Sequence, residues 1–236
     1  MTSILAIETS TVTCSVALQV GSQMIAKCAQ EPRSHSKLLM TMVQDILSEA
    51  SLTPSQLDAI GVTVGPGSFT GLRIGFATVQ GLAYANDKPV VPISSLQVMV
   101  ATYLRKYFSD PAPARHHEIV AILDARMSEY SMGRYGLNGD SEVVPLESDQ
   151  LVGIEQALSL TTIGSPLAII GEADQLVKIK PELAALYKRV YPQAEDILPI
   201  AHTAHKKGKA VPVTEVDLVY LRGREAWQKR KRLREG

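Results

Sequence analysis

The first thirty residues alternate between apolar and polar positions in a way that predicts three short strands. Residues 4–8, "ILAIE", are an apolar run, and residues 14–20, "CSVALQV", place larger apolar side chains at every second position. A turn at Gly21 and Ser22 leads into residues 24–30, "MIAKCAQ". Because the connections are short, we expect the three strands to pair as an antiparallel meander.

The period then changes to that of a helix. Apolar residues recur three and four positions apart within residues 34–50, which predicts an amphipathic helix. A strand over 59–64, a glycine-rich turn, a helix over 69–85, a strand over 89–94 and a helix over 95–108 follow. Three strands followed by alternating helices and strands predict a mixed sheet with helices on its faces, in the ribonuclease-H-like topology.

The second half of the chain is less regular. Residues 109–117, "SDPAPARHH", are rich in breakers and predict a linker. The elements expected beyond it are strands within 118–126, 128–137, 141–147 and 166–172, and a helix within 197–210. We therefore predict an actin-like α/β fold of two lobes, as in sugar kinases. Its parts would be an N-terminal lobe over 1–108, a degenerate second lobe over 118–221 and a basic tail over 222–236.

Composition changes this picture little. The chain has 24 Lys and Arg against 24 Asp and Glu, so its net charge of zero predicts no partner. No segment approaches the roughly 20 apolar residues that cross a bilayer, and we expect a cytoplasmic protein without membrane contact. The two cysteines, Cys14 and Cys28, lie in strand-like segments, which predicts buried, reduced thiols.

The turn within residues 64–75, "VGPGSFTGLRIG", is a candidate phosphate loop. Gly65 and Gly67 permit close backbone approach, Ser68 can cap the following helix, and free amides at a helix start attract anions. The turn lacks the lysine followed by Ser or Thr of a Walker A loop. The alternative is that its glycines serve only tight packing of strand against helix.

Residues 7–14, "IETSTVTC", form a second candidate. Glu8 stands at the end of the first predicted strand, where actin-like phosphotransferases place an Asp, and Thr9 and Ser10 can face a phosphate. No glycine lets this turn approach a ligand closely, so any nucleotide site should be weak. Asp124, at the end of a later strand, is either a catalytic carboxylate or the ion-pair partner of Arg126. The five histidines form no recognisable metal motif.

Four segments resemble the bacterial TsaB family, also called YeaZ: "ILAIETS", "VGPGSFTGLRIG", "ILDARMSEY" and "VYLR". The resemblance spans nearly the whole chain and implies the actin-like fold. It also implies a role in making threonylcarbamoyladenosine beside the anticodon of tRNAs that read codons beginning with adenine, as a non-catalytic subunit without a cofactor of its own. TsaD transferases carry two metal-binding histidines where this chain has Ser95 and Met99.

The resemblance also implies partners. The chain would pair with TsaD through the first helices of its N-terminal lobe, TsaE would join the pair, and the isolated protein would form a homodimer through the same surface. ATP or ADP would bind, if at all, at the interface of the complex. The candidate interface residues are Leu39, Met42, Val43, Ile46, Arg73 and Phe76. The alternative is that the apolar members cover their own sheet.

The tail over 222–236 carries seven basic residues against two acidic ones. Such a tract can contact tRNA phosphates, and the alternative is a solvated chain end. Two other functions compete with the subunit role. An actin-like phosphotransferase or ATPase would require nucleotide hydrolysis by the isolated chain. A glycoprotease-like metallopeptidase of the M22 type would require a bound metal.

Overall fold

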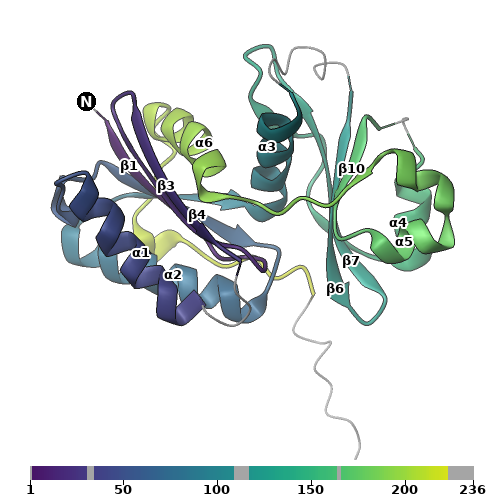
Figure 1. Cartoon of the computed structure of the whole chain (residues 1–236), viewed down its shortest axis with the longest axis horizontal. Helices are drawn as coiled ribbons and strands as arrows, with labels where there is room; N and C mark the ends of the chain where they lie inside the picture. The colour runs from purple at the N-terminus through teal and green to yellow at the C-terminus, as the bar shows by residue number, and fades with distance from the viewer. Residues whose placement is uncertain (1, 31–34, 109–116, 164–165, 223–236) are drawn as a thin grey trace, which may run out of the picture.

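The protein folds into two lobes, each built on one β-sheet (Figure 1). A computed structural model describes residues 2–30, 35–108, 117–163 and 166–222. Most of the predicted linker over 109–117 and the basic tail beyond Arg222 lie outside these ranges. Within them, no helix combines the length and the apolar character needed to cross a bilayer.

The first sheet has five strands in the order β3-β2-β1-β4-β5. They are β1 (Ser3–Glu8), β2 (Cys14–Val20), β3 (Gln23–Ala29), β4 (Ala59–Gly65) and β5 (Val90–Ser94). The first three pair antiparallel, and β4 and β5 add parallel strands on the other side of β1. This arrangement confirms the predicted meander and the mixed sheet that follows from it.

Side chains alternate between the two faces of this sheet, and different helices cover each face. Leu5 and Ile7 of β1 point into a core formed with α1 (His35–Glu49) and α2 (Phe69–Asn86). Ile4 and Ala6 point to the opposite face, against α6 (Ala194–Lys206). Figure 1 shows α1 and α2 on one side of the strands and α6 on the other. The period of two along β1 thus serves two cores.

The second sheet repeats the topology of the first. Its main path runs β11-β10-β6-β7-β8. The strands are β6 (Ile119–Arg126), β7 (Glu129–Leu137), β8 (Val143–Pro145), β10 (Ala168–Gly171) and β11 (Tyr187–Lys188), with β9 (Gln150–Gly153) pairing β7. An antiparallel meander, β6-β7-β8, is again extended by two parallel strands beside its first member. The two lobes therefore have the same strand order, which supports the prediction of two related halves.

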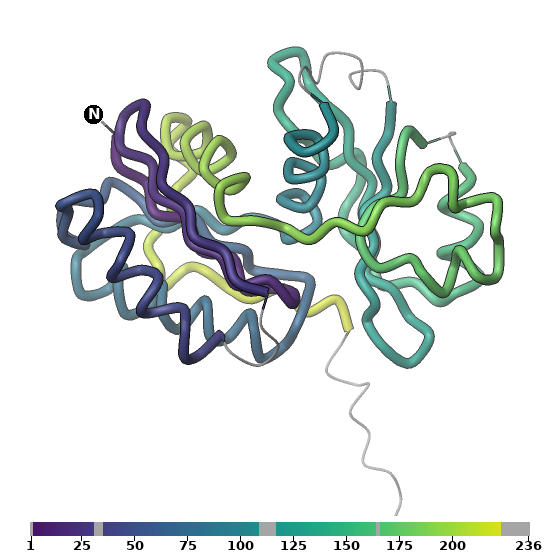
Figure 2. Tube along the Cα trace, viewed as in Figure 1, coloured from purple at the N-terminus to yellow at the C-terminus, as the bar shows by residue number. Residues whose placement is uncertain are grey.

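Helices also cover both faces of the second sheet. One face packs against α3 (Ser95–Tyr107), and the other against α4 (Ile154–Leu160) and α5 (Asp174–Ile179). Short 3-10 helices in the described ranges are η1 (Pro54–Gln56), η3 (Pro181–Ala185) and η4 (Val213–Glu215). Figure 2 shows how the chain passes from one lobe to the other and returns.

The lobes are not continuous in sequence, contrary to the predicted division into 1–108 and 118–221. Although α3 precedes residue 108, most of its buried side chains pack on the second sheet, and only Val98 joins the core of the first lobe. Conversely, α6 and the chain after it return to the first lobe. The sheet face that α1 and α2 leave open needs an apolar cover, and Ile197, Leu198 and Ala201 of α6 supply it. Gly61 makes room, because a Cβ there would lie 2.6 Å from Ile197.

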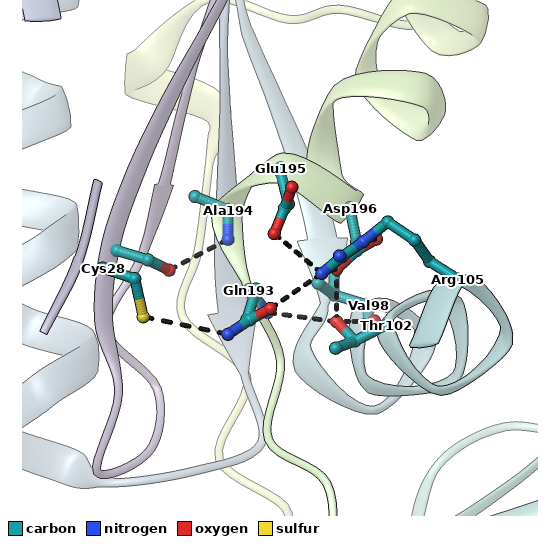
Figure 3. A network of polar contacts seen from close by, with 9 residues as sticks. Cys28, Val98, Thr102, Arg105, Gln193, Ala194, Glu195 and Asp196 are labelled. Atoms are coloured by element: carbon teal, nitrogen blue, oxygen red, sulfur yellow. Dashed lines mark hydrogen bonds and ion pairs between the residues drawn. The ribbon is translucent and has the colours of Figure 1, made fainter. Parts of the chain in front are cut away.

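A polar network ties the start of α6 to α3 (Figure 3). The Arg105 Nε atom of α3 donates to Asp196 Oδ1 at 2.7 Å, and Nη2 donates to Asp196 Oδ2 at 3.0 Å. Thr102 Oγ1 donates to the same carboxylate at 2.7 Å. Because Asp196 is buried and fully hydrogen-bonded here, the network holds the chain where it crosses between the lobes.

The two cysteines differ in environment. Cys14 is buried in β2, as predicted, and desolvation there raises the pKa of its thiol to about 11. Cys28 is exposed on the edge strand β3, so the prediction of a second buried thiol is wrong. An edge strand has only one neighbour, and its outer side chains reach solvent.

Candidate functional site

A cleft of about 740 Å³ opens between the two lobes. Its wall on the first lobe comes from the turn after β1, the start of α1 and the glycine-rich turn before α2. Its wall on the second lobe comes from the end of β6 and from Glu172, which follows β10. The lining residues are Ser10, Thr11, Val12, His35, Ser36, 67–71, Ile74, 123–126 and Glu172. Both candidate phosphate loops thus reach this cleft.

The glycines bring these two turns into direct contact. A Cβ on Gly67 would collide with the carbonyl oxygen of Ser10, and one on Gly71 would collide with that of Thr9. The amide of Ser68 donates to Ser10 O at 2.7 Å, and Thr9 Oγ1 donates to Gly71 O at 2.9 Å. The geometry therefore favours the packing interpretation of the glycine turn over an open phosphate cradle.

Ser68 caps α2 as predicted. Its Oγ accepts from the amide of Gly71 at 3.2 Å, and its own amide is bound to Ser10. Two amides at this helix start are therefore already paired within the chain, which weakens the attraction for an anion.

Glu8 does not reach the cleft. It is completely buried, and its Oε1 accepts from the amide of Ser10 at 2.6 Å and from Ser10 Oγ at 2.5 Å. Desolvation raises the pKa of the carboxyl to about 7, although contacts with Ser10 and the Thr63 side chain lower it. The predicted phosphate contact of Glu8 is therefore wrong, because the side chain turns inward and closes its own turn.

Some of the other predicted phosphate contacts line the cleft, and some do not. Thr9 is buried beneath α2, and Gly65 is buried where the C-terminal chain passes. Neither lines the cleft, whereas Ser10, Gly67 and Ser68 do. A ligand contact by these three residues stays a prediction.

Charged side chains dominate the wall of the second lobe. Arg126 forms an ion pair with Asp124, with Nη1 to Oδ2 at 3.4 Å, and its amide donates to Asp124 Oδ1 at 2.7 Å. The amide of Asp124 in turn donates to Glu172 Oε2 at 3.1 Å. Asp124 is therefore the ion-pair partner of Arg126, the second of the two predicted roles. The Arg126 side chain, 84% exposed, leaves a cation at the cleft.

The turn between β6 and β7 is unusual, and the sequence did not predict it. Arg126, Met127 and Ser128 have φ of 69°, 57° and 61°, three consecutive left-handed residues without glycine. Arg222 donates to the carbonyl oxygens of Ala125 and Arg126 at 3.0 and 3.1 Å. The segments "ILDARMSEY" and "VYLR" therefore meet in space, although about 95 residues separate them.

Most of the predicted interface residues lie in the core. Four of the candidate interface residues pack against the first sheet and are at most 9% exposed: Leu39, Met42, Val43 and Ile46. Their assignment to the partner interface is therefore wrong. Phe76 is half-buried, and Arg73 is exposed. A helical apolar stripe faces its own sheet first, because that burial stabilises the lobe. The exposed large apolar residues on these helices are Met40, Phe69 and Tyr84.

A groove of about 660 Å³ lies between α2 and residues 216–220. Phe69 packs against Tyr220 with ring centroids 5.4 Å apart, and the Arg73 guanidinium lies 3.7 Å from the Phe69 ring centroid. The Nε atom of Arg73 also donates to Tyr220 Oη at 3.2 Å. Aromatic and arginine side chains thus gather at the exposed surface of α2.

The positions that the resemblance aligns with transferase histidines are interior. Ser95 and Met99 of α3 are both fully buried, and Ser95 Oγ has no hydrogen-bond partner. A Cβ on Gly171 would lie 2.9 Å from Met99 Cε, so the methionine fills the space above β10. Among the residues that the structure describes, no three His, Cys, Asp or Glu side chains are placed to hold a metal together.

The repeated sheet topology and the cleft between the lobes define the chain as a two-lobed protein of the actin-like class. Comparison with known proteins narrows this class. A family model of the tRNA N6-adenosine threonylcarbamoyltransferase TsaD matches residues 28–204. The tRNA threonylcarbamoyladenosine biosynthesis protein TsaB of Escherichia coli (strain K12) is 34% identical over 237 residues, covering 96% of this chain and 97% of that protein.

Two further proteins show the same similarity to TsaB along nearly the whole chain. TsaB of Haemophilus influenzae is 28% identical and covers 96% of each chain. The solved structure of YeaZ from Pseudomonas aeruginosa superposes with a TM-score of 0.80 at 31% identity, over 94% of this chain and all of that one. The chain belongs to the TsaB family of tRNA threonylcarbamoyladenosine biosynthesis proteins.

Proposed function

We propose that this protein is a non-catalytic subunit that pairs with a TsaD transferase and holds it in an active form. The modification made is threonylcarbamoyladenosine, on tRNAs that read codons beginning with adenine. TsaE joins the pair, and the complex acts in the cytoplasm. The kinship with both TsaB and TsaD supports this proposal.

The observation that carries the proposal is the exposed surface of α1 and α2. Tyr84 is 78% exposed, Phe69 54% and Met40 44%. Arg73 and Phe76 are the two predicted interface residues that reach this surface. Exposed aromatic, methionine and arginine side chains grouped on neighbouring helices have the composition of interaction hot spots. We infer that these residues, instead of the buried stripe of α1, contact the transferase.

The same surface supports a homodimer of the isolated protein, which would compete with the heterodimer. The absence of chemistry is inferred from α3 and the cleft. A buried serine and methionine at 95 and 99 do not replace an imidazole pair on a catalytic iron or zinc. At the cleft, the polar contacts of the Asp124 carboxylate are with the side chain and the amide of Arg126, which supports a structural role for this carboxylate.

Two finer parts of the proposal concern ligands of the complex. ATP or ADP would bind only at the interface of the complex, with Ser10, Gly67 and Ser68, which line the cleft, as the candidate contacts of this chain. The basic tail beyond Arg222 would contact tRNA phosphates without selecting a sequence. Its contribution should appear as a reduced dependence of tRNA binding on salt when Arg230, Lys231 and Arg232 are replaced by alanine.

Reconstitution tests the central claim. Modified tRNA is counted with TsaD, TsaE and the enzyme that supplies threonylcarbamoyl-adenylate, with and without this protein. We expect formation of the product to depend on its addition. An assay that responds to the E. coli TsaB but not to this chain would overturn the subunit role.

A matched pair of variants tests the surface. Tyr84→Asp, on α2, should weaken pairing with TsaD at least about tenfold, because an ionised carboxylate would replace an aromatic contact. Ile179→Asp is the control, since Ile179 is 53% exposed on α5 of the other lobe. Pairing is measured by titration calorimetry. Equal affinities of the two variants would place the interface elsewhere.

A further inference from the structure

The chain that follows α6, here called the strap and comprising residues 211–222, is bound first to the N-terminal lobe. Val211 pairs with Val90 through two backbone hydrogen bonds of 2.8 and 2.9 Å. Val213 and Val216 are buried in the core beneath α1 and α2. The amide of Val219 then donates to Val64 O at 2.8 Å. Up to residue 219, the strap is therefore part of the first lobe.

Val219 lies beside the glycine turn of the first lobe. Gly65 has φ of 124°, and a Cβ there would collide with the carbonyl oxygen of Val219. The strap consequently lies against the end of β4, immediately before the turn that forms one wall of the cleft. Figure 2 shows its yellow trace passing beneath the sheet toward the space between the lobes.

Arg222 then crosses to the second lobe. Its Nε donates to Glu129 Oε2 at 3.0 Å, and its Nη2 donates to the carbonyl oxygens of Ala125 and Arg126 and also contacts Glu129. Its Nη1 lies 3.6 Å from Met127 Sδ. The planar guanidinium fork is suited to several acceptors at once, and a lysine ammonium is not an equivalent replacement.

These contacts bind the left-handed turn of residues 126–128. Left-handed backbone costs energy for residues other than glycine, and it persists where surrounding contacts hold it. Arg222 supplies such contacts, since it binds the carbonyl groups on the entry side of the turn and a carboxylate on its exit side. The same turn carries Ala125 and Arg126, which line the cleft.

The strap thus holds both walls of the cleft within a short length of chain. Val219 is bound at the end of β4, and Arg222 is bound at the end of β6, three residues later. Three extended residues span at most about 10 Å. The other crossings lie at the start of α3 and before α6, where the Arg105 network joins the lobes. The contact of Arg222 at the cleft restrains opening and closing of the lobes, which the two other crossings alone would allow.

We propose that Arg222 is an interlobe clamp: through the 126–128 turn it sets the spacing of the two lobes and thereby the width of the cleft. The inference concerns the isolated chain and does not require the proposed pairing with TsaD. Tyr220 links the clamp to α2, because the packing of Tyr220 on Phe69 and Arg73 orders the strap directly before Arg222. The clamp therefore connects the exposed surface of α2 with the wall of the cleft.

Spin-label distances across the lobes test the clamp. Labels are placed at Lys37 on α1 and Lys178 on α5, both exposed, in a Cys28→Ser background that leaves only the buried Cys14. We expect one narrow distance distribution for this reference protein. Arg222→Gln should broaden it or add a population of longer distances. Arg126→Gln is the control, because it removes the same charge from the same turn without touching the strap.

Three outcomes overturn the proposal: an unchanged distribution in a folded Arg222→Gln protein, an equal effect of Arg126→Gln, or full function of Arg222→Lys as a clamp. If Arg222→Gln does not fold, Glu129→Gln replaces it. That variant keeps both carbonyl contacts of Arg222, and its distance distribution should broaden to an intermediate extent. An unchanged distribution would contradict the proposal. Amide hydrogen exchange supplies a second readout, since exchange at residues 126–129 should accelerate in Arg222→Gln while exchange in β1 stays unchanged.

Discussion

Replacing Glu8 by Gln removes a titratable group from the first lobe while preserving the shape of the side chain. The carboxyl is completely buried, and desolvation raises its pKa from 4.5 to about 7. The amide and hydroxyl of Ser10 can still donate to the remaining oxygen of a glutamine. The substitution therefore isolates the cost of ionising this group inside the protein.

The magnitude follows from the two pKa values. They differ by about 2.5, and each pKa unit corresponds to about 1.4 kcal/mol. Between these values the folded protein binds the proton more tightly than the unfolded chain, so the free energy of unfolding falls as the pH rises. The loss from this carboxyl should total about 3 kcal/mol between pH 4.5 and pH 7 and should change little above that range.

Urea unfolding at half-unit steps from pH 4.5 to pH 8 measures the effect. The stability of Glu8→Gln relative to the unchanged protein should increase by about 3 kcal/mol across this range, because glutamine stays neutral. Glu155→Gln on α4 is the control for loss of an exposed carboxylate, and its profile should parallel that of the unchanged protein. Parallel profiles for Glu8→Gln would refute the reasoning.

Three further predictions concern packing and reactivity. Gly71→Ala should destabilise the first lobe by about 1–3 kcal/mol, because the new Cβ would meet backbone atoms, whereas Gly81→Ala in the same helix has open space and should stabilise by about 0.5–1 kcal/mol. The two variants should therefore shift the urea midpoint in opposite directions, and shifts in the same direction would contradict this reasoning. Asp196→Asn should cost about 2 kcal/mol in thermal unfolding, because it removes the buried charge that pairs with the half-exposed Arg105, which keeps only its second ion pair, with Glu195. A Tm within 1 °C of the starting protein would exclude that role. A thiol reagent should label Cys28 in the native protein and the second cysteine only after denaturation, which simultaneous labelling would disprove.

The order of elements in the first lobe was predictable because it rests on local periodicity. Strand and helix patterns over residues 4–108 predicted each main element to within a few residues, including the Ser68 cap of α2. These patterns record which residues must be apolar along one segment. They do not record which surface each apolar face will meet.

The predictions that were wrong depended on which surface an apolar face or a side chain meets. The stripe containing Leu39 and Ile46 was equally compatible with a partner and with the chain's own sheet, and the sheet covers it. Glu8 ends a strand as a catalytic carboxylate would, yet its side chain is buried and hydrogen-bonded to Ser10. For the stripe of α1 the deciding contacts come from other segments of the chain, and Glu8, although it is held by the nearby Ser10, is buried only in the folded lobe.

Family membership, the two-sheet class and the first meander were thus encoded in motifs and periods that act over short distances. The assignment of α3 and α6 to opposite lobes required the assembled sheets, because each helix packs on the face that other helices leave open. The meeting of the 126–128 turn with Arg222 likewise required tertiary structure, since it joins groups about 95 residues apart. Local propensity selects the elements, and the burial of their remaining faces places them.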